Sequence, residues 1–217
     1  QYNTKNFETA VINFQHQKNA NPKIQKAIIE YERLLKDIAK NIKNSGSPYG
    51  FVSIGSAIVC TMRAYVSIGG IPPKKATEDF YFLQKLAKYN IVHHIDDILV
   101  YPSSRAEQRV YLGTGFRMKN IKNNILFDDL YVPEKAYKNL QFLYQIIESK
   151  WNCEGKEIMS CLVKNNSKLY QYLEKNNFIQ IFESIQKNSI DKKQLLSQFH
   201  RWFDNLKIYK FLKLYGN

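Results

Sequence analysis

The first quarter of the chain carries the clearest hydrophobic pattern, a stripe with steps of three and four residues. The stripe consists of Ile24, Ile28, Tyr31, Leu35, Ile38 and Ile42. This spacing places the six side chains on one face of a helix. Pro22 suits the first turn of such a helix, and Asn44-Ser45-Gly46 suits its end. The pattern predicts a long helix between these signals, whereas the polar residues 1–20 favour no particular element.

The middle third of the chain holds most of its Gly and Pro residues, so we expect loops and short elements there. Phe51–Ile54 favours a short strand. Gly55-Ser56 opens an expected helix that reaches Tyr65 and stops at Gly69-Gly70.

A second helix is expected from Glu78 to Lys88, with Thr77 as its N-cap. Ile91-Val92 and Ile98–Tyr101 favour two strands around a turn at residues 93–97. This alternation of short strands and helices is typical of an α/β edge.

The last third of the chain is expected to be helical, because there is neither Gly nor Pro between Lys156 and Tyr215. From about Val132 onward the apolar spacing predicts four or five helices. One stripe comprises Tyr137, Leu140, Leu143, Ile147 and Trp151, and a stripe on a single final helix comprises Leu195, Phe199, Trp202, Leu206 and Tyr209. The sequence therefore predicts an α+β fold that is mostly α, with one domain over residues 1–118 and a helical extension over 119–217.

Composition narrows the class of protein. With 44% hydrophobic and 14% aromatic residues, the chain can bury a sizeable core, which excludes a disordered protein. Its formal net charge is +13, from 32 Lys+Arg against 19 Asp+Glu. Most of these cations are Lys, whereas nucleic-acid sites tend to favour the planar fork of Arg. We therefore expect affinity for anions but no nucleic-acid partner.

Two features of the sequence bear on where in the cell the protein resides. The cysteines Cys60, Cys153 and Cys161 are odd in number and lack close pairing, which favours reduced thiols in a cytoplasmic compartment. The final helix carries Lys207, Lys210 and Lys213, so it could lie on an anionic membrane. This leaves open a non-catalytic helical module that binds a protein partner or a membrane surface.

Candidate chemistry centres on Gly69-Gly70 and on Thr77-Glu78-Asp79 at the start of a helix. Acidic residues are common in a first helical turn, because the unpaired N–H groups there favour negative charge. A carboxylate at a rigid helix start is also well placed to take a proton from a substrate hydroxyl. The spacing alone is compatible both with a structural role at the helix start and with a catalytic role for these carboxylates.

Taken in order, these pieces resemble the second half of a family-2 glycosyltransferase catalytic domain of the GT-A fold. The resemblance rests on Gly55-Ser56-Ala57, Arg63-Ala64, Gly69-Gly70, Thr77-Glu78-Asp79-Phe80 and Pro102-Ser103-Ser104-Arg105. It covers about residues 29–118. The resemblance implies an inverting transfer of a sugar from a nucleotide-sugar donor to a hydroxyl of a glycan or other acceptor.

The resemblance also implies roles for individual residues. Asp79 would be the general base, and Glu78 would orient it or bind acceptor hydroxyls. The substrate-binding positions would be Gly55, Ser56, Gly69, Gly70, Arg105 and Arg109, with the two arginines facing the donor diphosphate. Surface ion pairs are an equal alternative for both arginines. Tyr31 and Glu32 could flank the acceptor, although helix packing and solvation explain them as well.

This sequence also departs from the family pattern. Complete members begin with nucleotide-binding strands and an Asp-x-Asp motif that holds a divalent cation, Mg or Mn, and this chain has no Asp-x-Asp. We therefore expect that the natural protein starts upstream of Gln1 and that these 217 residues alone neither bind that cation nor turn over. One of His93 and His94 is a candidate to complete a metal site, but the two are poor ligands for the same ion, because adjacent residues of a strand point to opposite faces.

Overall fold

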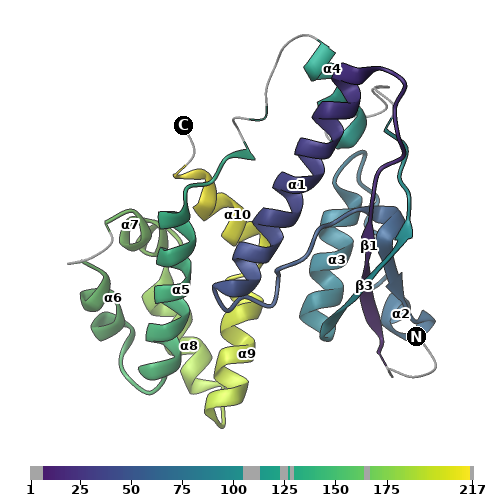
Figure 1. The fold of residues 1–217 in the computed structure, drawn as a ribbon. Coiled ribbons are helices and arrows are strands. Elements are labelled where there is room, and N and C mark those ends of the chain that lie inside the picture. The colour runs from purple at the N-terminus through teal and green to yellow at the C-terminus, as the bar shows by residue number, and fades with distance from the viewer. Residues whose placement is uncertain (1–6, 105–112, 123–126, 128–129, 164–166, 216–217) are drawn as a thin grey trace. The chain divides into compact units, whose positions relative to one another are not determined.

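The computed structural model describes residues 7–104, 113–122, 127, 130–163 and 167–215 (Figure 1). The fold is α+β and mostly helical, with one small mixed sheet, as the sequence predicted. Its contacts divide the chain into two compact units. Unit 1 comprises Gln1–Lys40 and Gly50–Leu130, and unit 2 comprises Asn41–Tyr49 and Tyr131–Asn217.

Unit 1 is built on a three-stranded sheet with the order β2-β1-β3. The central strand β1 (Thr9–Phe14) pairs antiparallel with β2 (Ile58–Cys60) and parallel with β3 (Val92–Val100). The register against β3 shifts on both sides of Asn13, which marks an irregularity in the pairing. The sheet thus joins three segments that are far apart in the sequence.

The helices of unit 1 follow the predicted positions more closely than the strands do. The long helix α1 (Pro22–Asn44) and helix α3 (Glu78–Tyr89) are confirmed. Between them lie the short 3-10 helix η1 (Gly55–Ala57) and helix α2 (Met62–Ser67). Helix α4 (Thr114–Lys122) lies near the end of the unit.

The strand predictions were right only in part: Val92 and Ile98–Val100 lie in β3, but the rest of the prediction was wrong. The predicted strand at Phe51–Ile54 is a loop, and β2 occupies part of the segment expected to be helical. No turn interrupts residues 93–97, because β3 runs through them as one strand paired with β1. The central strand β1 lies in the stretch that favoured no element.

A core cluster ties α1 to the end of unit 1. Tyr31 and its helical neighbours pack against Met118 and Phe127, and the rings of Tyr31 and Phe127 are 5.5 Å apart. Because of these contacts unit 1 extends to Leu130, whereas the sequence placed a domain boundary after residue 118.

Unit 2 is a helical bundle. Its helices are α5 (Glu134–Ser149), α6 (Gly155–Val163), α7 (Ser167–Lys175), α8 (Phe178–Lys187), α9 (Lys192–Trp202) and α10 (Asn205–Lys213). Aromatic rings fill its core; the rings of Phe199 and Phe203, for example, stack at 5.9 Å. The predicted single final helix is in fact two helices, because Asp204 caps α10 and breaks the run. Of the helices that the structure describes, none is long and apolar enough to cross a membrane.

Candidate functional site

The carboxylate of Asp79 lies in the first turn of α3, beside the loop that precedes β2. Its Oδ1 accepts a hydrogen bond from the backbone N–H of Phe80 at 2.7 Å. Burial raises the pKa of Asp79 above its ordinary value of 3.8, and the nearby charge of Glu78 adds to the rise. The backbone N–H groups of Phe80 and Gly55 oppose this rise by stabilising the charged form, but they do not cancel it.

Gly55 is the direct neighbour of this carboxylate. A Cβ atom at Gly55 would lie 3.6 Å from Cβ of Asp79, so the two backbones are in close contact. Ser56, the next residue of η1, is exposed, as is Glu78. The structure therefore brings together Gly55, Ser56, Glu78 and Asp79, which the sequence had connected only through a resemblance.

Thr77 precedes α3 in a left-handed conformation, with φ of 64°. Its hydroxyl donates to the carbonyl of Ala76 at 2.5 Å and does not cap the helix. Thr77 thus occupies the predicted N-cap position of α3, but its side chain makes no capping hydrogen bond. A non-glycine residue at positive φ carries a conformational cost, and such positions are concentrated near functional sites.

Gly69 and Gly70 end helix α2, as predicted. Both have positive φ, 73° and 69°, and the Gly70 N–H donates to the carbonyl of Tyr65 at 2.9 Å. A Cβ at Gly70 would lie 3.0 Å from the hydroxyl oxygen of Tyr65. The positive φ angles at the end of α2 therefore explain why both positions are glycine. The side chain nearest to Gly70 is that of Tyr65, and not that of Asp79.

Arg105 and Arg109 lie outside the described residues, so their predicted contact with a diphosphate stays a prediction. Residues 102–104, just before Arg105, are hydrogen-bonded to the loop after β1. The Gln17 N–H donates to the carbonyl of Pro102 at 2.9 Å. The side-chain amide of Asn19 donates to the buried Ser104, at 3.1 Å to its carbonyl and 3.2 Å to its hydroxyl.

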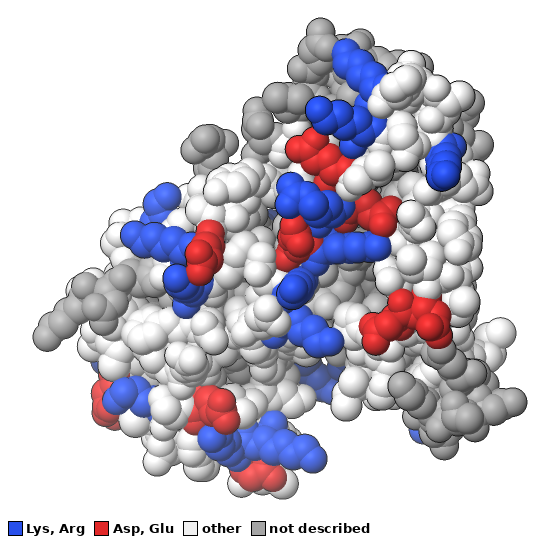
Figure 2. Space-filling model, in the orientation of Figure 1, with Lys and Arg blue, Asp and Glu red and all other residues white. Residues whose placement is uncertain are grey.

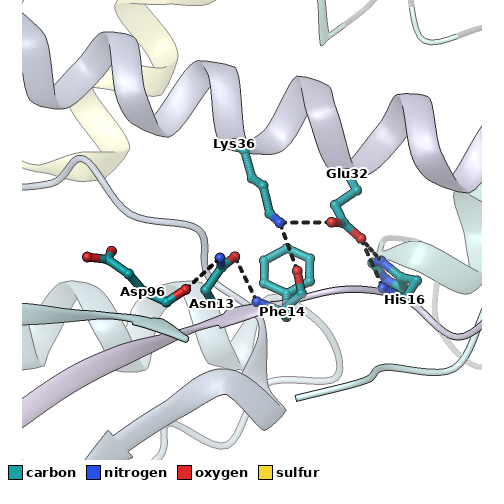
Figure 3. Close-up of polar contacts among 6 residues, drawn as sticks. All are labelled: Asn13, Phe14, His16, Glu32, Lys36 and Asp96. Carbon is teal, nitrogen blue, oxygen red and sulfur yellow. Dashed lines mark hydrogen bonds and ion pairs between the residues drawn. The ribbon is translucent and has the colours of Figure 1, made fainter. Parts of the chain in front are cut away.

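A polar cluster that the sequence did not reveal joins the end of β1 to α1 (Figure 3). Glu32 accepts hydrogen bonds from the His16 backbone N–H at 2.9 Å and from Lys36 Nζ at 2.8 Å. His16 Nδ1 lies 3.1 Å from the same carboxylate, and Lys36 Nζ also donates to the carbonyl of Phe14 at 2.8 Å. Asn13 extends the cluster by donating to the carbonyl of Asp96 at 3.0 Å.

The charges in this cluster follow from burial and pairing. Burial lowers the pKa of His16 more than the neighbouring Glu32 raises it, so the imidazole is neutral and its Nδ1–H donates to Glu32. Burial acts to raise the pKa of Glu32, but hydrogen bonds from Lys36 and His16 outweigh it and the pKa is lowered. The His16 side chain is 2% exposed and its Nε2 is buried without a partner. We interpret the cluster as a clamp between strand and helix, because His16 is buried and the charged groups of Glu32 and Lys36 bind each other and the backbone of β1 and the loop after it.

The signal for this cluster was partly present in the sequence. Glu32 and Lys36 are spaced i,i+4 on a helix, which predicts their ion pair. The partnership with His16 depends on β1, which the sequence did not predict. Tyr31, the other residue considered for the acceptor, is buried in the core cluster and serves packing.

The remaining metal-type residues do not converge. His93 and His94 are consecutive on β3, opposite Ala10 and Val11 of β1. In the part of the chain that the structure describes, no three His, Cys, Asp or Glu side chains are grouped so that they could hold a metal ion. The described residues therefore supply no ligand set for the divalent cation that the family resemblance implies.

Unit 2 contains a groove of about 210 Å³ between α5, α9 and the loop at residues 44–46. His200 lines the groove, and burial lowers its pKa to about 4. The imidazole is therefore neutral at physiological pH. The backbone carbonyl oxygen of His200 accepts a hydrogen bond from the hydroxyl of Tyr49 at 2.9 Å. This bond links two segments of unit 2.

Comparisons with protein-family models, with curated proteins and with solved structures found no match to this chain. The assignment of function therefore depends on the chemistry of the residues themselves.

Proposed function

We propose that unit 1 carries the acceptor side of an inverting glycosyltransferase, with Asp79 as its general base. The substrates would be a nucleotide-sugar donor and an acceptor hydroxyl on a glycan or a similar molecule. Glu78 would orient the acceptor beside Asp79. Gly55, Ser56, Gly69 and Gly70 would shape the surface on which sugar and acceptor lie.

The observation that carries this proposal is the environment of Asp79. Its carboxylate is partly buried at a rigid helix start, directly against Gly55. A raised pKa makes a carboxylate a stronger base, because the efficiency of proton transfer follows basicity. Perturbed carboxyl pKa values are concentrated at functional sites.

The proposed reaction is a single displacement. The acceptor oxygen forms a bond to the anomeric carbon while its proton passes to the carboxylate of Asp79. The bond between that carbon and the diphosphate oxygen breaks on the opposite face, and its electron pair leaves with the nucleoside diphosphate. Attack from the opposite face inverts the anomeric configuration. We assign no step to a divalent cation, because the described residues offer no ligand set for it.

The alternative of a membrane-binding module through the final helix is less well supported. Ile208, Phe211 and Leu212 form the apolar face of α10 and are buried within unit 2. These side chains already pack inside unit 2, so they could enter a bilayer only if the packing of unit 2 opened.

Asp79→Asn tests the proposal in the protein expressed from its complete reading frame. Asparagine keeps the shape and the oxygen that accepts from Phe80, but it cannot take a proton. We expect sugar transfer from nucleotide-sugar donors to fall by about 10²–10⁴-fold, the usual contribution of a general base. Donor screening by release of nucleoside diphosphate measures the effect.

Asp37→Asn is the matched control. Asp37 lies on α1, half exposed, 3.3 Å from Arg33, and an exposed pair of this kind contributes little. Transfer by the Asp37→Asn protein should equal that of the wild type. If Asp79→Asn retains wild-type transfer, or if the wild type transfers no sugar from any nucleotide donor, the proposal is wrong.

A further inference from the structure

We propose that helix α2 and the loop after it dock on an anionic membrane surface. The contact surface, here called the α2 patch, consists of the apolar side chains of Met62, Tyr65, Val66 and Ile71 with the cations Arg63, Lys74, Lys75 and Lys85. The inference is independent of the proposed sugar transfer, because it rests only on the exposure and charge of these residues.

The apolar part of the α2 patch protrudes into solvent. Met62 is 75% exposed and Val66 is 67% exposed, and their i,i+4 spacing puts them on one face of α2. Tyr65 anchors this face, since its ring packs 5.8 Å from that of Phe82. Ile71, 51% exposed, follows Gly70, whose backbone N–H donates to the carbonyl of Tyr65 at 2.9 Å.

The cations lie on α2, on the loop after it and on α3, where Lys74 Nζ is 4.2 Å from the ring centre of Tyr81. From Thr61 to Thr77 the chain contains Arg63, Lys74 and Lys75 and no Asp or Glu. Lys85 reaches the same loop from α3, because its Nζ donates to the carbonyl of Ile68 at 3.3 Å. Within the described residues, Arg63 has an acidic neighbour in Glu8, 3.7 Å from its guanidinium, but the Arg63 side chain remains 79% exposed.

Apolar side chains with a cationic rim match the chemistry of an anionic bilayer. The apolar groups can enter the acyl region while Lys and Arg remain with the lipid phosphates, and the two contributions add. Exposed apolar patches with a polar rim mark protein or membrane contacts. A stable protein interface needs roughly 20–30 residues on each side. The α2 patch has only eight residues, four of them apolar, which favours a membrane over a protein partner.

Sedimentation with vesicles tests the inference on the 217-residue chain. We expect the chain to pellet with vesicles of phosphatidylcholine containing about one third phosphatidylserine at low salt, and not with phosphatidylcholine alone. The triple variant Met62→Ser/Val66→Ser/Ile71→Ser should bind at least about tenfold more weakly, because it removes the inserting groups. Lys74→Glu/Lys75→Glu should weaken binding by at least about tenfold, because it removes the electrostatic attraction between these cations and the anionic lipids.

Matched controls come from unit 2. Ile190 is 92% exposed, and Lys187 and Lys193 are exposed on other helices. Ile190→Ser and Lys187→Glu/Lys193→Glu should bind as the wild type does. Circular dichroism verifies that each variant is folded. The inference is wrong if the wild type does not pellet with anionic vesicles, if the triple variant binds unchanged, or if Lys210→Glu/Lys213→Glu on α10 removes binding instead.

Discussion

At the scale of single residues, Asp79 is held in an environment that opposes its charge. A carboxylate whose pKa is raised by burial binds its proton more tightly in the folded state than in the unfolded state. The folded protein therefore loses stability as the pH rises from 3.8 through the raised pKa. The same burial that strengthens Asp79 as a base thus destabilises the fold at neutral pH.

This linkage predicts the effect of Asp79→Asn on stability. At neutral pH the variant should unfold at a higher temperature than the wild type, because it carries no buried charge. The difference should shrink as the pH falls and vanish below 3.8, where Asp79 is protonated in both states. Thermal melts followed by circular dichroism between pH 3 and 8 measure it.

Asp37→Asn again provides the control, since an exposed carboxylate should change stability by less than about 0.5 kcal/mol. A lower melting temperature for Asp79→Asn at neutral pH would show that the charged form of Asp79 is stabilised by the fold, contrary to this prediction.

At the scale of elements, capping side chains decide where the helices of unit 2 begin. The Asp204 carboxylate accepts from the Lys207 N–H at 3.2 Å, and Asp191 accepts from the Gln194 N–H at 2.7 Å. The apolar stripe from Leu195 to Tyr209 continues across Asp204 without interruption. The helix is therefore interrupted between α9 and α10 because Asp204 caps α10. The hydrophobic pattern alone does not predict this interruption.

Replacing this cap should destabilise unit 2. We expect Asp204→Ala to lower the free energy of unfolding by about 0.5–2 kcal/mol, because the N–H of Lys207 loses its partner in a buried position. Asp204→Asn should retain most of the stability, since asparagine caps as well as aspartate does. Urea unfolding measures both, and equal loss in the two variants would assign the effect to charge rather than to capping.

At the scale of the whole molecule, the net charge is +13, but the long helix α1 does not form a surface of one sign. Figure 2 shows Lys and Arg side chains interleaved with Asp and Glu over α1. Arg33 pairs there with Asp37, and Lys36 pairs with Glu32. Such interleaving weakens any single-sign surface that could follow a phosphate backbone.

The charge distribution predicts poor nucleic-acid binding. In fluorescence-anisotropy titrations of duplex DNA and of RNA at about 150 mM salt, we expect no saturable binding at micromolar protein. A saturable signal that weakens steeply with added salt would contradict this prediction and would point to a basic surface formed by the tertiary structure.

The sequence predicted the elements that depend on local signals. The helices α1 and α3, and the stop of α2 at Gly69-Gly70, follow from apolar spacing and from glycine at positive φ. The position of Asp79 in the first turn of α3 was also predicted, whereas its role as a base stays a prediction. Each of these features is encoded within a few neighbouring residues, so no tertiary information was needed to find it.

Only the tertiary structure decided the sheet and the groups that the sheet brings together. Strand β1 shows no alternating pattern, because the consecutive residues Thr9, Ala10 and Val11 are all buried, and both of its partner strands come from later in the chain. The three residues of β2 are too few to show a period. The contact of Gly55 with Asp79 and the clamp of His16, Glu32 and Lys36 join segments that only the paired strands hold in place, so no local pattern could reveal them.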